Sequence, residues 1–142
     1  MRIHVLNGPN LNLLGEREPD IYGTLSLSDI ETSLKEAAGA NELVFRQTQA
    51  EDELIAWLHE AFLAKEPVII NPAAFTHYSY ALRDAVAALT SSGIKVIEVH
   101  ISNPHSRETF RHTSVISGVA TGVIAGFGAD SYLLALAQLT RD

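Results

Sequence analysis

Hydrophobic residues along the chain form short continuous runs that are separated by longer stretches with a different spacing. The short runs are rich in Val, Ile and Leu, which is typical of strands that are covered on both faces of a sheet. They predict five strands, at Arg2–Asn7, Leu43–Gln47, Val68–Asn71, Lys95–His100 and Gly118–Ala125.

The stretches between these runs place apolar residues three and four positions apart, as on one face of an α-helix. Between Glu51 and Ala64, for example, Leu54, Leu58 and Phe62 fall on one stripe. The spacing predicts helices at Leu27–Ala38, Glu51–Ala64, Tyr78–Leu89 and Ser131–Leu139, with a short helix near Arg107–Ser117.

Strands that alternate with helices predict a parallel sheet, because each helix carries the chain back across the sheet as a right-handed crossover. We therefore expect an α/β fold, a flavodoxin-like doubly wound sheet of five parallel strands flanked by helices. A chain of 142 residues is long enough for one hydrophobic core, and it contains no linker or internal repeat. A single domain over residues 1–142 is expected.

Composition narrows the range of partners. The formal net charge of −7 disfavours nucleic acid, whose phosphates require a basic surface. The absence of cysteine excludes disulfides and thiolate chemistry. The first residues lack the apolar region of a signal peptide, and glycines and Asp130 interrupt the apolar stretch 117–139. We expect a cytoplasmic protein with no contact with a membrane.

Polar side chains follow the predicted strands at the points where the strands end. Asn10, Arg17 and Tyr22 come after the first strand, Asn71 ends the third, and His100 ends the fourth. The carboxyl ends of parallel strands meet at one edge of the sheet, where such folds bind their ligands. A tyrosine, arginines and histidines at this edge suit acid–base chemistry on a polar organic molecule.

Several segments resemble the signatures of type II 3-dehydroquinate dehydratases. These segments are NGPNLNLLGEREPDIYG, INPAAFTHYSYALRDA and EVHISNPHSRETFRHTS, and the tail VIAGFGADSYLLAL is similar to the last strand and helix of the family. They occur in the family's order and cover most of the chain. The resemblance implies dehydration of 3-dehydroquinate to 3-dehydroshikimate, by anti elimination through an enolate, with no metal and no other cofactor. It leaves open whether the reaction serves aromatic amino acid biosynthesis or quinate breakdown.

The resemblance also implies a role for each reacting group. Tyr22 would be the base, and a free tyrosine has a pKa near ~10, so Arg17 would be needed to favour its phenolate. His100 would be the acid that protonates the leaving hydroxyl. Glu98 lies two residues earlier, on the same face of the strand, and would hold the His100 ring. Asn10 would stabilise the enolate oxygen.

A set of binding residues for a small anionic substrate is implied in the same way. The backbone N–H groups of Ile101 and Ser102, with the Ser102 hydroxyl, would receive the substrate carboxylate, and Arg111 would hold a ring hydroxyl. The full set implied is Asn71, His77, Asp84, Ile101, Ser102, Arg107 and Arg111.

Asp84 is implied to reach the site of a neighbouring subunit, because members of the family assemble as trimers, four of which form a dodecamer. The resemblance therefore implies a homo-oligomer. Without it, four of the implied residues have simpler interpretations. Arg17 could pair with an acidic residue of its own loop, and Asp84 could be a solvated helix residue paired with Arg83. Asn10 could be a turn residue, and His100 could be a strand-end residue that bonds only the backbone.

The chain departs from the family's pattern at three places. It has Thr48-Gln49-Ala50-Glu51-Asp52 where the family usually has Ser-Asn-His-Glu-Gly, Ala73 where a glycine is common, and Phe75 where a tyrosine is common. We expect these departures to affect the floor of the pocket or an interface rather than the reaction.

Three other functions are compatible with parts of the sequence. A nucleotide-binding module would need G-x-x-x-x-G-K-[ST] or G-x-G-x-x-G, and the chain contains neither. A metal hydrolase would have to use His100, His105 and His112, whose spacing matches no standard zinc motif. The departures from the family's pattern suggest a family member that has lost catalysis and only interacts with other molecules. The presence of Arg17, Tyr22, Glu98 and His100 argues against this possibility.

Overall fold

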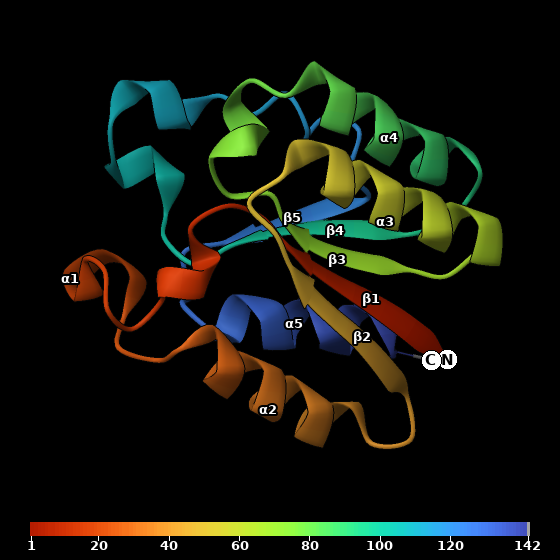
Figure 1. Ribbon diagram of the computed structural model, residues 1–142, viewed down its shortest axis with the longest axis horizontal. Coiled ribbons are helices and arrows are strands. Elements are labelled where there is room, and N and C mark those ends of the chain that lie inside the picture. Colours follow the sequence, from red (N-terminus) through yellow and green to blue (C-terminus); the bar gives the residue numbers. More distant parts are fainter. Residues whose placement is uncertain (142) are drawn as a thin grey trace.

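The computed structural model of the chain, which describes residues 1–141, is a parallel sheet between two layers of helices (Figure 1). The strands are β1 (Arg2–Asn7), β2 (Glu42–Gln47), β3 (Val68–Asn71), β4 (Val96–His100) and β5 (Gly122–Ala125). They lie in the order β2-β1-β3-β4-β5, and all neighbouring pairs are parallel. This is the strand order of flavodoxin-like doubly wound sheets, so the predicted fold is confirmed.

Helices α2 and α5 cover one face of the sheet, and α3 and α4 cover the other (Figure 1). The helices are α1 (Pro19–Tyr22), α2 (Leu27–Ala38), α3 (Glu51–Ala64), α4 (Tyr80–Ser91) and α5 (Asp130–Leu139). Short 3-10 helices lie at η1 (Leu11–Leu13), η2 (Ala73–His77), η3 (Pro104–Ser106) and η4 (Thr109–His112). Within residues 1–141, none of these helices is both long and apolar enough to cross a membrane.

The core lies on both faces of the sheet because side chains alternate along each strand. On β1, Ile3 and Val5 pack into the cluster beneath α2 and α5, whereas Leu6 packs into the cluster beneath α3 and α4. On β3, Ile69 belongs to the first cluster and Ile70 to the second, and both are fully buried. This double burial explains why the strands appear in the sequence as continuous apolar runs.

The predicted start of the fifth strand is wrong. Strand β5 begins at Gly122, where it pairs with Ile97, and not at Gly118. The Ile116 carbonyl accepts hydrogen bonds from the N–H groups of Val119 and Ala120, so the chain makes a turn before it joins the sheet.

Two predicted helices also have different bounds. Helix α4 begins at Tyr80 rather than Tyr78, because the Ser79 side chain accepts the N–H of Leu82 and caps the helix. The short helix expected near Arg107–Ser117 is confined to Thr109–His112. The starts of β2, β4 and α5 each differ from the prediction by a single residue.

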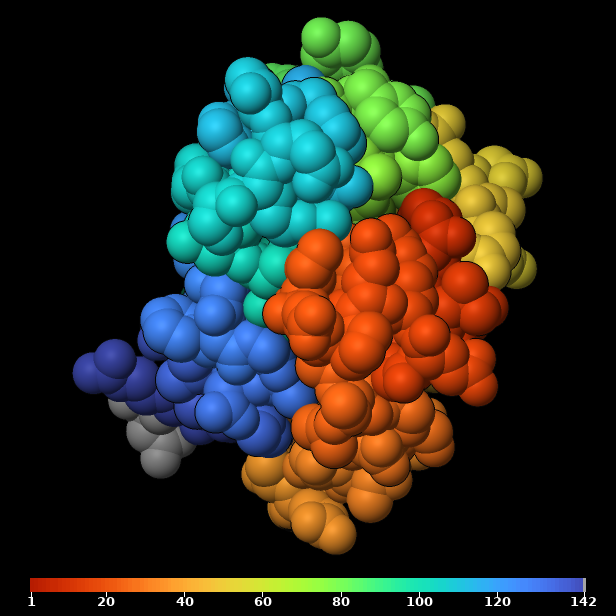
Figure 2. Space-filling model, turned by 90° about the vertical axis from the view of Figure 1, so that its left-hand side faces the viewer, coloured from red at the N-terminus to blue at the C-terminus, as the bar shows by residue number. Residues whose placement is uncertain are grey.

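The loops that follow β1 and β3 touch one another at the carboxyl edge of the sheet. A Cβ atom added at Gly8 would lie 2.7 Å from the carbonyl oxygen of Pro72, so only glycine allows this approach. Strands β1 and β3 are neighbours where the strand order reverses, which is where doubly wound sheets bind ligands. Figure 2 shows this edge, with the red and orange segment after β1 against the teal segment after β4.

Candidate active site

A cavity of about 140 Å³ lies at this edge, between the loop after β1, the η2 turn and the segment after β4. Arg17, Arg107 and Arg111 line it together with His77 and His100, whereas no acidic side chain of residues 1–141 does. The cavity lining is therefore positively charged although the whole chain has a net charge of −7. Such a cavity suits a small anionic ligand.

Most residues predicted from the sequence for the site line this cavity. They are Asn10, Arg17, Tyr22, Asn71, His77, His100, Ile101, Ser102, Arg107 and Arg111. Glu98 lies behind His100 instead. Asp84 does not line the cavity of its own chain: it is exposed on α4, and its Oδ1 lies 2.8 Å from Nη1 of Arg83.

A wider cavity of about 500 Å³ adjoins the first, and Tyr22, Ile101, Ser102 and Arg107 line both. Asp20 and Glu108 line only the wider cavity. Their carboxylates repel an anion at neutral pH, so the smaller cavity is the better candidate site.

Two guanidinium groups lie against the Tyr22 ring. The Cζ atom of Arg17 is 4.9 Å from the centre of the Tyr22 ring, and that of Arg107 is 5.0 Å from it. The sequence predicts only Arg17 as a partner of Tyr22. Arg107 reaches the ring from the segment after η3, so its contact depends on the fold rather than on closeness along the chain.

Arg17 also makes the alternative contact considered from the sequence. Its Nε atom lies 3.3 Å from Oε2 of Glu18, the residue before α1. A guanidinium carries several N–H donors, so an ion pair on one side and contact with an aromatic ring on the other can coexist. Arg17 thus ties the Tyr22 ring to the start of the helix that carries it.

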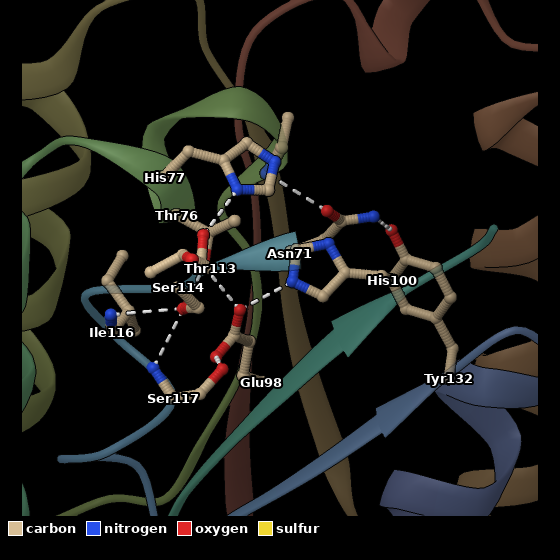
Figure 3. Close-up of polar contacts among 11 residues, drawn as sticks. Asn71, Thr76, His77, Glu98, His100, Thr113, Ser114, Ile116, Ser117 and Tyr132 are labelled. Carbon is tan, nitrogen blue, oxygen red and sulfur yellow. Dashed lines mark hydrogen bonds and ion pairs between the residues drawn. The ribbon is translucent and has the colours of Figure 1, made fainter. Parts of the chain in front are cut away.

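Glu98 and His100 form a hydrogen-bonded pair on β4. Glu98 is fully buried, and its Oε2 lies 2.5 Å from Nε2 of His100 (Figure 3). A carboxylate only accepts hydrogen bonds, so Nε2 of His100 carries the hydrogen. The other ring nitrogen, Nδ1, makes no hydrogen bond within residues 1–141 and is free to contact a ligand.

Three hydroxyl groups that the sequence does not predict as part of the site support Glu98, two of them directly and Ser114 through Thr76 (Figure 3). The Ser114 Oγ accepts the N–H groups of Ile116, at 3.1 Å, and Ser117, at 2.9 Å. Both of its lone pairs are therefore used, and its own hydrogen goes to Oγ1 of Thr76 at 2.6 Å. Thr76 then donates to Oε2 of Glu98 at 2.5 Å.

Ser117 completes this arrangement, because its hydroxyl donates to Oε1 of Glu98 at 2.6 Å. Burial alone would raise the pKa of the Glu98 carboxyl. The hydrogen bond and charge of His100, with the hydrogen bonds from Ser117 and Thr76, outweigh burial and hold this pKa below its ordinary value. Glu98 is therefore a carboxylate at neutral pH, and it holds the His100 ring in one orientation.

The tautomer of His77 is determined by its contact with the backbone. Its Nδ1 lies 2.8 Å from the carbonyl oxygen of Thr113, which can only accept, so Nδ1 carries the hydrogen. In neutral His77 the remaining nitrogen, Nε2, is an acceptor. The Phe110 ring packs edge-on against the imidazole, with 5.7 Å between ring centres, and helps to hold it. His77 can therefore accept a hydrogen bond from a ligand hydroxyl.

Ser102 and the two arginines after it form the opposite part of the lining. Nη1 of Arg107 donates to the Ser102 hydroxyl at 3.1 Å, and Nε of Arg111 donates to Glu108 at 3.0 Å. The Arg107 Nε is buried and has no hydrogen-bond partner within residues 1–141. Both side chains are thus held in place with N–H groups left over for an anion.

The first departure from the family's pattern contacts the loop that carries Asn10. Oε1 of Gln49 accepts the N–H of Asn10 at 2.8 Å, and Nε2 of Gln49 donates to Asn12 at 2.7 Å. Asn10 has a φ of 70°, a conformation that asparagine tolerates better than most residues. Gln49 therefore helps to hold Asn10 in place from outside the cavity.

The other two departures have different consequences. Ala73 has a φ of 53°, in the left-handed region where glycine is favoured, so the residue common in the family fits this backbone better. Phe75 is buried in the apolar cluster beneath α3 and α4, where a side chain without a hydroxyl leaves no polar group unpaired.

His100, His105 and His112, the residues of the alternative metal site, line one further cavity. His105 and His112 lie beside one another, with 5.9 Å between ring centres. Within residues 1–141, however, no three His, Cys, Asp or Glu side chains are grouped so that they could hold a metal ion.

Comparisons of the sequence and of the structure with known proteins identify the same family. The family model described as dehydroquinase class II matches residues 1–140. A 3-dehydroquinate dehydratase of Salinispora arenicola is 54% identical over 98% of this chain and 96% of its own. One of Bacillus licheniformis is 56% identical over 94% of this chain and 92% of its own. The crystal structure of type II dehydroquinase from Propionibacterium acnes superposes with a TM-score of 0.94 at 47% identity, covering 99% of this chain and 97% of its own.

Proposed function

Because the chain belongs to the class II dehydroquinase family and is a 3-dehydroquinate dehydratase, we propose that it removes water from its substrate with Tyr22 as the base and His100 as the acid. The observation that carries this proposal is that both residues line one cavity, each beside the charged partner that its role requires. The two residues come from different elements, α1 and β4, so they can act on different atoms of one bound molecule.

The substrate is an anion, and the lining of the cavity supports its binding. The carboxylate is received by the Ser102 hydroxyl and the backbone N–H groups of Ile101 and Ser102, while Arg111 contacts a ring hydroxyl. Asn71 and His77 bind the polar groups of the ring, and Arg107 adds positive charge between Tyr22 and Ser102. No acidic side chain of the described residues opposes the substrate charge in this cavity.

Tyr22, as the phenolate, removes a proton from the carbon next to the ketone. The electron pair of the broken C–H bond moves toward the ketone oxygen and forms an enolate. The two permanent positive charges against the Tyr22 ring, from Arg17 and Arg107, are the electrostatic support that a tyrosine base requires. Asn10 stabilises the enolate oxygen, because a donor held in place before the reaction needs no reorganisation during it.

His100 then gives a proton to the hydroxyl on the adjacent carbon. The C–O bond breaks, the enolate collapses to form the carbon–carbon double bond, and water leaves. Glu98 accepts the Nε2–H of His100 and fixes its ring, so that the proton that is transferred leaves from Nδ1. Loss of the proton and of the hydroxyl from opposite faces of the ring makes this an anti elimination. Proton exchange with solvent returns both residues to their starting states.

Assembly forms part of the proposal. Asp84 is exposed on α4 and lies outside the cavity of its own chain. It therefore contributes to catalysis only if it enters the site of a neighbouring subunit, as in a trimer-based dodecamer. The cytoplasmic location and the choice between biosynthesis and quinate breakdown stay predictions.

The test of this function is direct. Purified protein is mixed with 3-dehydroquinate, and formation of the conjugated enone product is followed by ultraviolet absorbance. We expect turnover that is unchanged after exhaustive chelation of metals. A folded sample with no absorbance change would overturn the proposed activity.

A further inference from the structure

A fully buried tyrosine, Tyr132 on α5, does not line the cavity but is hydrogen-bonded to a residue that does. Its ring does not line the cavity, but its hydroxyl accepts a hydrogen bond from Nδ2 of Asn71, which does, at 2.9 Å (Figure 3). The hydroxyl also donates to Oδ1 of Asn7 at 2.7 Å. The proposed mechanism assigns neither Tyr132 nor Asn7 a role.

The two asparagines are brought together by the register of the sheet. Asn7 ends β1 and Asn71 ends β3, and the two residues are direct partners across these parallel strands. Both are buried, and both side chains lie on the α5 face, since they share it with Val5 and Ile69. The Tyr132 hydroxyl enters from α5 and bridges the two amides.

The hydrogen bonds run in one direction from end to end. The backbone carbonyl of Arg46 accepts from Nδ2 of Asn7 at 3.0 Å, so Oδ1 of Asn7 is left to accept from Tyr132. The Tyr132 oxygen in turn accepts from Nδ2 of Asn71. Oδ1 of Asn71 then accepts the backbone N–H of Ala73 at 3.1 Å. The Arg46 carbonyl therefore fixes one end of this series of hydrogen bonds, and the Ala73 N–H fixes the other.

This direction determines how the Asn71 amide faces the cavity. If the amide flipped, its Nδ2 would face the N–H of Ala73, donor against donor. Its oxygen would then compete with Asn7 for the single hydrogen of the Tyr132 hydroxyl. Burial raises the pKa of the Tyr132 phenol, so the hydroxyl stays protonated and keeps that one hydrogen at neutral pH.

We propose that Tyr132 is a positioning residue for substrate binding, which holds the Asn71 amide in the one orientation that matches a polar group of the substrate ring. The inference rests on the proposed function, because it takes Asn71 as a substrate ligand. Asn71 contacts the substrate both before and during the reaction, so the loss of its orientation weakens binding more than it slows the chemistry.

The first test is Tyr132→Phe, which removes only the hydroxyl. We expect KM to rise about five- to tenfold while kcat stays within about twofold, as for the loss of one oriented hydrogen bond. Thr90→Val is the matched control. It removes a hydroxyl that donates to the Val119 carbonyl, at the end of α4 away from the cavity, and should leave KM unchanged. An unchanged KM in Tyr132→Phe would overturn the inference.

A double-mutant cycle separates positioning from general loss of stability. If Tyr132 acts through Asn71, adding Tyr132→Phe to Asn71→Ala should raise KM no further. Fully additive effects would mean that Tyr132 acts by another route. Asn7→Ala provides a second variant in case Tyr132→Phe fails to fold. The Asn7 side chain does not line the cavity, so a raised KM in this variant is expected only if the chain of hydrogen bonds orients Asn71.

The dissociation constant of the product, 3-dehydroshikimate, should rise by the same factor as KM when measured by calorimetry. This readout does not require turnover, so it tests the inference even if the proposed dehydration fails. Conversely, wild-type turnover with an unaltered KM and dissociation constant in both variants would overturn the inference and leave the proposed function intact.

Discussion

Glu98 and His100 are two residues apart on β4, and their side chains meet on one face of the strand with 2.5 Å between Oε2 and Nε2. Glu98 does not line the cavity itself, and in the proposed mechanism it acts through the imidazole of His100. In the proposed mechanism the pair is a proton donor with a buried counter-charge, and the first two predictions follow from it.

Glu98→Gln should lower kcat by about a hundredfold, the scale of lost general acid catalysis, with little change in KM. Glutamine keeps the size of the side chain and a carbonyl for the His100 N–H, but it lacks the negative charge that faces the imidazole. Steady-state kinetics measure the effect. Glu60→Gln, at an exposed carboxylate paired with Arg46, is the control and should behave as wild type. A Glu98→Gln enzyme with wild-type kcat would show that the charge is not needed.

Thr76→Val should move the acidic limb of the kcat/KM profile to higher pH. The pKa of Glu98 is held down by the hydrogen bonds of His100, Ser117 and Thr76 against the effect of burial. Removal of the Thr76 donor raises this pKa, so Glu98 becomes protonated at a higher pH and its support of His100 is lost earlier. Thr90→Val removes a hydroxyl that does not contact Glu98, so this control should keep the wild-type pH profile. An acidic limb that moves equally in both variants would argue against the role of Thr76.

Ala73→Gly should stabilise the protein by about 1 kcal/mol, since an L-residue is strained in the left-handed region and glycine is not. The φ of 53° at Ala73 is the cause. Urea denaturation measures the change in the free energy of unfolding. The same substitution at Ala56, an exposed position within α3, should instead destabilise by about 1 kcal/mol. Destabilisation by Ala73→Gly would contradict the interpretation of this backbone.

Asp84 can be tested by mixing subunits. Asp84→Ala and His100→Ala proteins are dissociated and reassembled together in equal amounts. If Asp84 acts in a neighbouring site, a site is intact where an Asp84→Ala subunit supplies His100 and its neighbour, a His100→Ala subunit, supplies Asp84. Random assembly makes up to about a quarter of the sites intact, so turnover should recover to that fraction of the wild-type value. The separate variants provide the baselines. No recovery on mixing, or a monomer with undiminished turnover, would count against a shared site.

The sequence predicted the fold and most of the cavity lining because both depend on strand ends. Continuous apolar runs located β1, β3 and β4, and the residues that end these strands or follow them, such as Asn71 and His100, meet at one edge in any parallel sheet. The start of β5 was misplaced, because the glycines and small residues before Gly122 have the hydropathy of a strand but form a turn.

The residues that hold the site residues in place could not be predicted from strand ends. Thr76 and Ser117 lie 22 and 19 positions from Glu98 along the chain, and Tyr132 lies 61 positions from Asn71. Serine and threonine are common at any position, and a tyrosine within an apolar helix has the appearance of a core residue. Only the fold shows that their hydroxyl groups end at residues of the site.

Exchange of the substrate's proton in heavy water tests the assignment of base and acid most directly. 3-Dehydroquinate is incubated in D2O with each variant, and deuterium at the carbon next to the ketone is followed by NMR. His100→Gln should still catalyse exchange through Tyr22 but form almost no product, because the hydroxyl cannot leave. Tyr22→Phe should catalyse neither exchange nor dehydration above the rate without enzyme. Exchange that persists in Tyr22→Phe and disappears in His100→Gln would contradict the account and reverse the two roles.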